Sequence, residues 1–195
     1  MPVKLLAISG STRAGSLNQA LVDLAAAEAR SRGAEVTPVD LKAFQLPLYD
    51  GDLEARAFPD AARELKALFR AHHGFLIASP EYNGGVSGVL KNAIDWVSRP
   101  TDGETLVALS AFRGKVAGLV AASISPFGGL RGITQLRQVL STIQVMVATE
   151  QVLVPFALDA FDETGALKQP LPAQLLGGLV ARVIELAERL EPPVA

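Results

Sequence analysis

Short hydrogen-bonding side chains are crowded directly after the first apolar run. Residues 6–21 read LAISGSTRAGSLNQAL, with Ser9, Ser11, Thr12, Ser16 and Asn18 beside a single cation, Arg13, and no lysine. The apolar run before them and the helical pattern after them predict a strand-to-helix loop, where free N–H groups and the helix dipole attract an anion. The loop lacks both the Gly-Lys-Ser/Thr of a Walker A motif and the G-x-G-x-x-G of dinucleotide-binding folds. These residues suit a terminal monophosphate held without a metal ion.

A simpler interpretation covers part of this loop. Ser16 precedes Gln19 by three residues, which is the spacing of a capping box at the start of a helix. Capping needs one hydroxyl, however, and leaves Ser11, Thr12, Arg13 and Asn18 unexplained. Phosphate binding is therefore the favoured hypothesis.

A second loop follows the third apolar run, in the sequence SPEYNGGVSGVLKNAIDW at residues 79–96. Pro80 and the Gly84-Gly85 pair allow a sharp turn whose backbone can approach a flat ligand, while Tyr82 and Asn83 offer an aromatic face and an amide. The alternative is a tight strand-to-helix turn with Tyr82 packing inward, and this segment alone does not decide between them. Trp96 is assigned no ligand role.

A third loop, ASISPFGGLRG at residues 122–132, again follows an apolar run. It combines the hydroxyls of Ser123 and Ser125 with Gly128-Gly129 and Arg131, and its glycines permit backbone donation to the edge of a planar ligand. The alternative is a helix start capped by Ser125.

Other residues with chemical potential have structural explanations. His72 and His73 are neighbours at the end of a helical pattern, so they are interpreted as charge at a helix C-terminus rather than as a metal site. The acidic run Asp50, Asp52 and Glu54 is interpreted as a solvated loop. The chain has no cysteine, which excludes disulfides, thiolate metal sites and a cysteine nucleophile. No metal site and no catalytic triad are expected, so redox chemistry would require a bound cofactor.

The elements that must position these loops follow from the apolar pattern. Strand-like runs at residues 3–8, 35–39, 74–78, 115–122 and 144–153 alternate with helical patterns at 18–32, 60–71, 86–98, 131–142 and 172–191. Uninterrupted apolar runs are typical of parallel strands covered on both faces. The sequence predicts one α/β domain over residues 1–195, in which the loops after strands one, three and four meet at the carboxyl edge of the sheet. The long connections 41–59 and 99–113 are candidates for functional loops.

Composition limits the partners. The 195 residues include 18 basic and 20 acidic side chains, a net charge of −2 that disfavours nucleic acid. The N-terminal apolar run is too short for a signal peptide, and runs such as residues 116–122 are too short to span a bilayer. We expect a cytoplasmic protein with no membrane segment.

Taken together, the motifs resemble the NADPH-dependent FMN reductase family, flavodoxin-like enzymes that include quinone, chromate and azo-dye reductases. The resemblance rests on Gly10-Ser11-x-Arg13-x-x-Ser16-x-Asn18, on Pro80-Glu81-Tyr82-Asn83-Gly84 and on Leu90-Lys91-Asn92-Ala93-Ile94-Asp95-Trp96. It extends to about residue 145 and covers the segment 41–59 and the tail after 155 only loosely.

The resemblance implies a flavodoxin-like three-layer sandwich with strand order 2-1-3-4-5, an FMN cofactor and NADPH or NADH as co-substrate. It implies a phosphate site at Ser11, Arg13, Ser16 and Asn18, a flavin-lining loop at Pro80, Glu81, Tyr82, Asn83 and Gly84, and closure near the ring and ribityl chain by Ser123 and Gly128. It also implies a homodimer or homotetramer. No catalytic side chain is expected, because the flavin carries the electron chemistry.

Three functions remain distinguishable at this point. The preferred one is a two-electron reductase that passes hydride from NADPH through FMN to a quinone, azo, flavin or metal-oxyanion acceptor by ping-pong kinetics. A flavodoxin-type one-electron carrier would use the same loops, but such carriers are strongly acidic and this chain is not. A non-redox scaffold is disfavoured by the intact ligand loops.

Overall fold

A five-stranded parallel sheet forms the centre of the molecule, with the order β2-β1-β3-β6-β7. The computed structural model describes residues 1–190. The strands are β1 (Lys4–Ser9), β2 (Glu35–Val39), β3 (Gly74–Ala78), β6 (Val116–Ala122) and β7 (Met146–Val154), and every neighbouring pair is parallel. Because β4 and β5 form a separate hairpin, this is the predicted order 2-1-3-4-5. The flavodoxin-like fold is confirmed.

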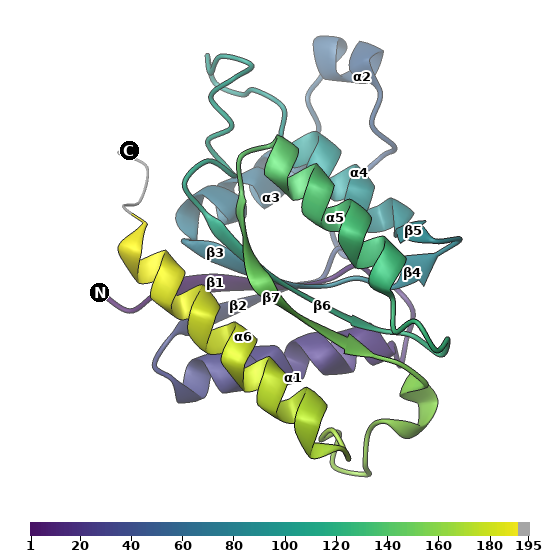
Figure 1. Cartoon of the computed structure of the whole chain (residues 1–195). Helices are drawn as coiled ribbons and strands as arrows, with labels where there is room; N and C mark the ends of the chain where they lie inside the picture. Colours follow the sequence, from purple (N-terminus) through teal and green to yellow (C-terminus); the bar gives the residue numbers. More distant parts are fainter. Residues whose placement is uncertain (191–195) are drawn as a thin grey trace.

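Helices cover both faces of the sheet (Figure 1). On one face lie α1 (Leu17–Ser31) and α6 (Pro170–Arg189), and on the other lie α3 (Asp60–Ala71), α4 (Gly88–Val97) and α5 (Leu130–Thr142). The five predicted helices are thus present, with ends within two residues of the predicted ones.

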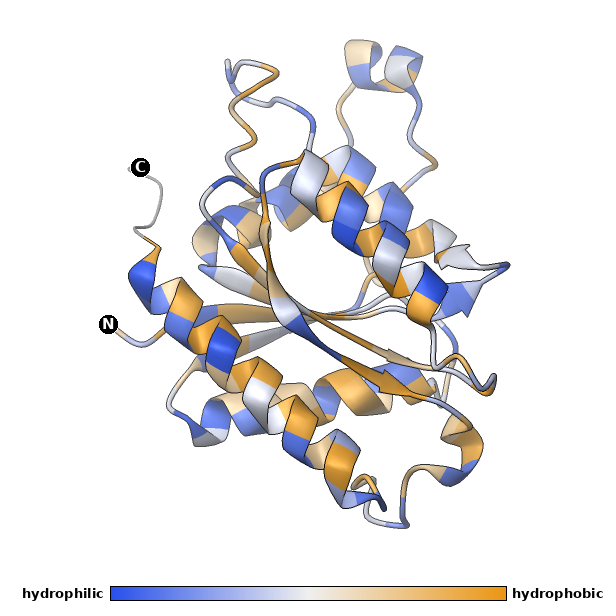
Figure 2. Cartoon of the chain, in the orientation of Figure 1, coloured by the Kyte–Doolittle hydropathy of each residue, from blue (hydrophilic) through white to orange (hydrophobic). Residues whose placement is uncertain are grey.

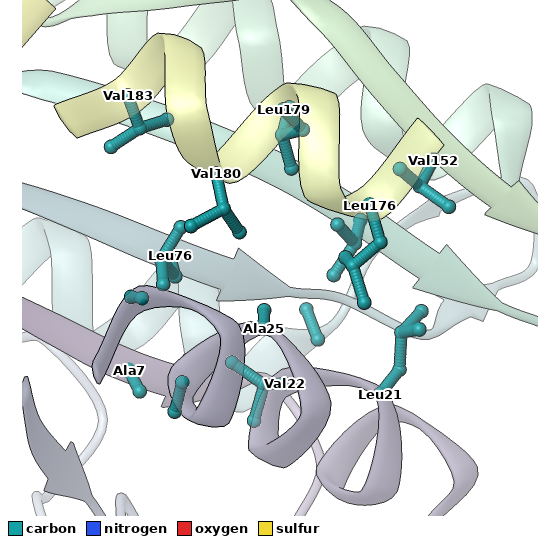
Figure 3. Packing of buried hydrophobic residues seen from close by; sticks show 14 of the residues in the cluster. Ala7, Leu21, Val22, Ala25, Leu76, Val152, Leu176, Leu179, Val180 and Val183 are labelled. Carbon is teal, nitrogen blue, oxygen red and sulfur yellow. The ribbon is translucent and has the colours of Figure 1, made fainter. Parts of the chain in front are cut away.

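The strand sequences explain this three-layer arrangement, because successive side chains of a strand point to opposite faces. Leu5 and Ala7 of β1 pack into the cluster with α1 and α6, whereas Leu6 and Ile8 pack into the cluster with α3, α4 and α5. The side chains that point to either face of the sheet are therefore apolar. Figure 2 shows this as hydrophobic colouring along the strands. Figure 3 shows the first cluster, where Leu21 and Val22 of α1 and residues of α6 enclose side chains of the sheet.

The last helix corrects one expectation about apolar length. α6 has 20 residues, with an 18-residue window of mean hydropathy 1.2, and so it is long and apolar enough by composition to cross a membrane. In this fold its Leu176, Leu179, Val180 and Val183 are buried against α1 and the sheet, which is the packing of a core helix (Figure 3).

Two segments predicted as loops contain regular structure. The connection 41–59 includes a short helix, α2 (Gly51–Arg56), which stands away from the sheet in Figure 1. The second predicted ligand loop contains a hairpin of β4 (Glu81–Tyr82) and β5 (Gly85–Val86), so α4 begins at residue 88 rather than 86. A short 3₁₀ helix, η1 (Ala157–Asp159), follows β7.

The acidic run near α2 is structural, not a freely solvated loop. The Asp50 side chain caps α2 by accepting the N–H of Asp52 at 2.8 Å. Glu54 accepts hydrogen bonds from Arg99 Nε at 2.9 Å and from the Tyr49 hydroxyl at 2.7 Å. These contacts fix α2 to the end of α4.

Candidate active site

The three predicted ligand loops meet at the carboxyl edge of the sheet. β1, β3 and β6 are adjacent, and each is followed by one of the loops. Two hydrogen bonds join the first two loops at Gly10: its N–H donates to Ala78 O at 2.8 Å, and its carbonyl accepts from Ser87 Oγ at 2.6 Å. The predicted convergence of these loops is therefore present.

Loop one borders an open pocket with a volume of about 590 Å³. Thr12 and Arg13 are exposed in its wall, Ser11 is half-buried, and Gln19 and Ala20 from the start of α1 also line it. The loop is braced by its own hydroxyls, since the Arg13 N–H donates to Ser11 Oγ at 3.4 Å. A helix N-terminus beside exposed hydroxyls and a guanidinium suits a phosphate group, and phosphate binding at loop one stays a prediction.

Ser16 combines two roles that the sequence offered as alternatives. It is the N-cap of α1, and its Oγ accepts the N–H of Gln19 at 3.3 Å. The reciprocal half of a capping box is not formed, because the Gln19 side chain donates to Asp23 instead. A hydroxyl has one hydrogen to donate besides its acceptor lone pairs, so the capping bond leaves Ser16 able to donate to a bound anion.

Asn18 joins loop one to the end of β6. Its Nδ2 donates to Ala122 O at 2.8 Å and its Oδ1 accepts the Ala122 N–H at 2.9 Å, with the side chain buried. This pairing holds α1 next to the residue that precedes Ser123. Direct contact between Asn18 and a phosphate stays a prediction.

The second loop presents its aromatic residue to solvent. Asn83 and Gly84 have φ values of 52° and 76° and connect the paired residues Tyr82 and Gly85, which defines a two-residue hairpin of the type I′ class. Tyr82 is 53% exposed, so the alternative in which it packs inward is wrong. Pro80, just before the hairpin, is buried. The Asn-Gly pair was the sequence signal for this hairpin.

The side chain of Glu81, in strand β4 of the hairpin, is buried and caps α5. Its carboxylate accepts the N–H groups of Arg131 at 2.9 Å and Gly132 at 3.2 Å, and Arg131 Nε at 2.7 Å. Burial alone would raise the pKa of Glu81, but these hydrogen bonds outweigh it and lower the pKa below its ordinary value. The Glu81 side chain is therefore an ionised brace between the second and third loops.

The third loop follows a path different from the predicted helix cap. The N-cap residue of α5 is Gly129, and the Ser125 N–H donates to Ser123 Oγ at 3.2 Å, so the alternative that Ser125 caps the helix is wrong. Gly128 has a φ of 60°, and a Cβ there would lie 3.1 Å from Leu153 Cβ. Packing against the end of β7 thus requires a glycine at residue 128.

The histidines lie at the opposite edge of the sheet. His72 is buried, with Nδ1 2.7 Å from Leu68 O and Nε2 2.9 Å from Thr37 Oγ1, and burial lowers its pKa. The interpretation of His72 as positive charge at a helix end is therefore wrong. Within residues 1–190, no group of three or more His, Asp or Glu side chains is placed to hold a metal ion.

Trp96, which the sequence left without a ligand role, is fully buried and donates Nε1–H to Pro47 O at 2.8 Å. It holds the segment before α2 against α4.

The fold is that of a flavodoxin-like protein, and three loops meet at the switch point of its doubly wound sheet. The model of the NADPH-dependent FMN reductase family matches residues 3–159, and the chain belongs to this family. It is an oxidoreductase that uses FMN and NAD(P)H.

Relatives cover nearly the whole chain. An NAD(P)H-dependent FMN reductase of Pseudomonas aeruginosa is 37% identical over 175 residues, which is 89% of each chain. An NAD(P)H:quinone oxidoreductase of Solanum tuberosum is 35% identical and covers 97% of this chain and 95% of its own length.

Solved structures share the fold. FerB, a flavoenzyme NAD(P)H:(acceptor) oxidoreductase of Paracoccus denitrificans, matches with a TM-score of 0.80 and 25% identity over 97% of this chain and 98% of its own. RosB, solved with 8-demethyl-8-formylriboflavin-5′-phosphate, matches with a TM-score of 0.78 and 16% identity over 96% of this chain and 80% of its own.

Proposed function

We propose that the protein carries two electrons, as hydride, from NAD(P)H through FMN to a quinone. The observation that carries this proposal is the meeting of an open phosphate loop with two neighbouring loops, one of which exposes Tyr82. Relatives named as quinone reductases, among them one of Escherichia coli that is 34% identical over 146 residues, support a quinone as the acceptor class. An azo dye, another flavin or a metal oxyanion are further acceptors within the proposal.

The residues of loop one fit the phosphate end of FMN. Arg13 supplies a positive charge, Ser11 and Ser16 supply hydroxyl donors, and the first turn of α1 supplies unpaired N–H groups and the positive end of its dipole. Arg13 has no carboxylate within 4 Å among the described residues, so its charge is available to a phosphate.

The other two loops fit the flat end. The backbone of the hairpin and of residues 123–129 can line a ring, while Tyr82 offers an exposed aromatic face. FMN, when bound, supplies the hydride-accepting and hydride-donating chemistry. The protein's tasks are to orient the flat ligand, to keep one face open to substrates and to neutralise the phosphate. None of these tasks needs an acid or base from the protein.

We further propose that NAD(P)H and the acceptor use the same open face in turn. The protein is proposed to act in the cytoplasm as a homodimer or homotetramer, in which a subunit boundary borders the open face. The one-electron carrier stays the alternative.

Absorption spectroscopy tests the proposal. The purified protein should take up one FMN per chain, and anaerobic NADPH should bleach the flavin band without a partner reductase. Initial rates at several quinone concentrations should give parallel double-reciprocal plots. Intersecting plots would contradict successive use of one face. Absence of direct reduction by both NADPH and NADH would favour the carrier, and a folded protein that leaves FMN fluorescence unquenched would favour the scaffold.

A further inference from the structure

The pocket at loop one extends well beyond the phosphate-binding residues. Its volume of about 590 Å³ lies in the range of roughly 300–1,000 Å³ that is usual for whole small-molecule ligands. Besides residues 11–16, the wall includes Gln19 and Asp23 of α1 and four residues at the end of β2, namely Pro38, Val39, Asp40 and Lys42. A single phosphate group fills a small part of this space.

The strand order shows that the pocket extends from loop one away from the two flavin-lining loops. β2 lies on one side of β1, whereas β3 and β6, which carry the two flavin-lining loops, lie on the other side. None of the described residues 80–86 or 123–129 lines this pocket. A ligand that runs from loop one toward the hairpin therefore leaves the β2 side of the pocket to a second ligand.

The charges on the β2 side suit a phosphorylated ribose. Asp40 directly follows β2, and its Oδ1 accepts the backbone N–H of Lys42 at 2.9 Å. Lys42 is exposed, and among the described residues its Nζ has no carboxylate within 4 Å. In dinucleotide-binding α/β sheets, an acidic residue after the corresponding strand receives the ribose hydroxyls, and a nearby basic residue receives a 2′-phosphate.

We propose that the β2 side of the pocket binds the adenosine ribose of NAD(P)H, with Asp40 at the ribose hydroxyls and Lys42 at the 2′-phosphate of NADPH. The inference rests on the proposed function and deepens it, because it assigns the choice between NADPH and NADH to two residues. The two side chains act in opposite directions. Lys42 attracts the 2′-phosphate, and the charge of Asp40 repels it.

Two isosteric or near-isosteric variants separate these effects. Lys42→Met keeps the length of the side chain and removes its charge. It should weaken the binding of NADPH about tenfold and leave the affinity for NADH unchanged. Asp40→Asn keeps an oxygen for the Lys42 N–H and removes the negative charge. It should strengthen the binding of NADPH and weaken the binding of NADH. Lys168→Met is the matched control, since Lys168 is also exposed but lies in the segment that follows η1.

Calorimetric titration gives a readout that does not depend on turnover. The probes are adenosine 2′,5′-bisphosphate and AMP, added to the FMN-loaded protein and, separately, to the apoprotein. We expect the bisphosphate to bind more tightly than AMP, to lose about tenfold in Lys42→Met and to lose nothing in Lys168→Met. In steady-state kinetics, Lys42→Met should raise the KM for NADPH by about the same factor and leave kcat unchanged.

Three results would overturn the assignment. One is an equal effect of Lys42→Met on NADPH and NADH, and another is no effect on either. The third is release of FMN by the bisphosphate, seen as recovery of flavin fluorescence, because that places the probe in the phosphate loop itself. Failure of the wild-type protein to take up FMN would instead count against the proposed function, while a loss of bisphosphate affinity in Lys42→Met apoprotein, relative to wild-type apoprotein, would still decide whether the ribose site exists.

Discussion

The two edges of the central sheet treat their polar groups in opposite ways. At the carboxyl edge, Arg13 and Tyr82 project from loops into solvent. At the amino edge, Lys115 is 1% exposed and donates to the carbonyl oxygens of Arg70 and His72. His73 Nδ1 there accepts the N–H of Lys4 at 2.9 Å.

The contrast separates polar groups that are available to a ligand from polar groups that stabilise the fold. A polar group whose partners are backbone atoms of its own chain is already satisfied, and removing it leaves those atoms unpaired. A polar group on an open loop is satisfied by water, which a ligand can displace. Histidine looks more reactive in a sequence than serine does, yet in this protein both histidines lie at the amino edge and Ser11 and Ser16 line the pocket at loop one.

Lys115→Ala should have the largest effect and should act on stability alone. Truncation opens a cavity and leaves the buried His72 carbonyl and the part-buried Arg70 carbonyl without their donor, so we expect the free energy of unfolding to fall by about 3 kcal/mol. Urea unfolding measures this loss, and FMN titration of the folded fraction should give an unchanged affinity. A parallel loss of FMN affinity would show that the two edges are coupled.

Arg13→Ala should give the converse result at the carboxyl edge. Loss of one charge-assisted hydrogen bond costs about 1.5–3 kcal/mol, so FMN should bind roughly ten- to a hundredfold more weakly. Riboflavin, which lacks the phosphate, should bind as before, and the urea midpoint should not move. Arg30→Ala, at the other end of α1, is the control. Equal losses for FMN and riboflavin would place Arg13 away from the phosphate.

Ser16→Ala sharpens the comparison because Ser16 both caps α1 and lines the pocket at loop one. It should weaken FMN more than riboflavin, and the lost N-cap should also lower the free energy of unfolding by about 1 kcal/mol. Ser16→Gly is the informative partner, since glycine is a tolerable N-cap and costs only a few tenths of a kcal/mol. A stability loss as large in Ser16→Gly as in Ser16→Ala would contradict the capping role.

The parallel sheet and the location of the loops at its carboxyl edge were predictable because their signals are local, whereas the strand order came from the family resemblance. Apolar runs of strand length and helical periodicity specify a parallel sheet, and its carboxyl edge specifies where loops meet. The motif Gly10-Ser11-x-Arg13 can be recognised from residues that are adjacent in the sequence. The Asn83-Gly84 turn was equally local, but the loop was interpreted by its aromatic residue and the hairpin was missed.

The roles of Asn18 and Glu81 were not predictable, because their partners are far away in sequence. Asn18 pairs with a backbone group 104 residues later, and Glu81 caps a helix 50 residues later. A sequence shows that such side chains stand near a ligand loop, but not whether they face the ligand or another loop. The helix α2 was missed for a related reason, since it is held by Glu54 contacts to Arg99.

The pH dependence of stability should give the smallest effect and should still distinguish the two edges. Burial lowers the folded-state pKa of His72 and His73 below the ordinary 6.5, so the unfolded chain binds more protons as pH falls through this range. Their contribution is present above the ordinary pKa of 6.5 and is lost as the pH falls below it through the lowered folded-state pKa of each ring. Glu81 at the carboxyl edge has a lowered pKa, and its contribution is lost only below its ordinary value of 4.5.

Urea unfolding at pH 5, 6 and 7 therefore reports on the amino edge. His73→Asn keeps a side-chain acceptor for the Lys4 N–H and cannot titrate, so its unfolding free energy should depend less steeply on pH than that of the wild-type protein. His72, the other histidine of the chain, contributes to the slope that remains. An unchanged slope in His73→Asn would mean that the Lys4 contact does not hold His73 neutral, and the amino edge would then lose one of the groups that distinguish it from the carboxyl edge.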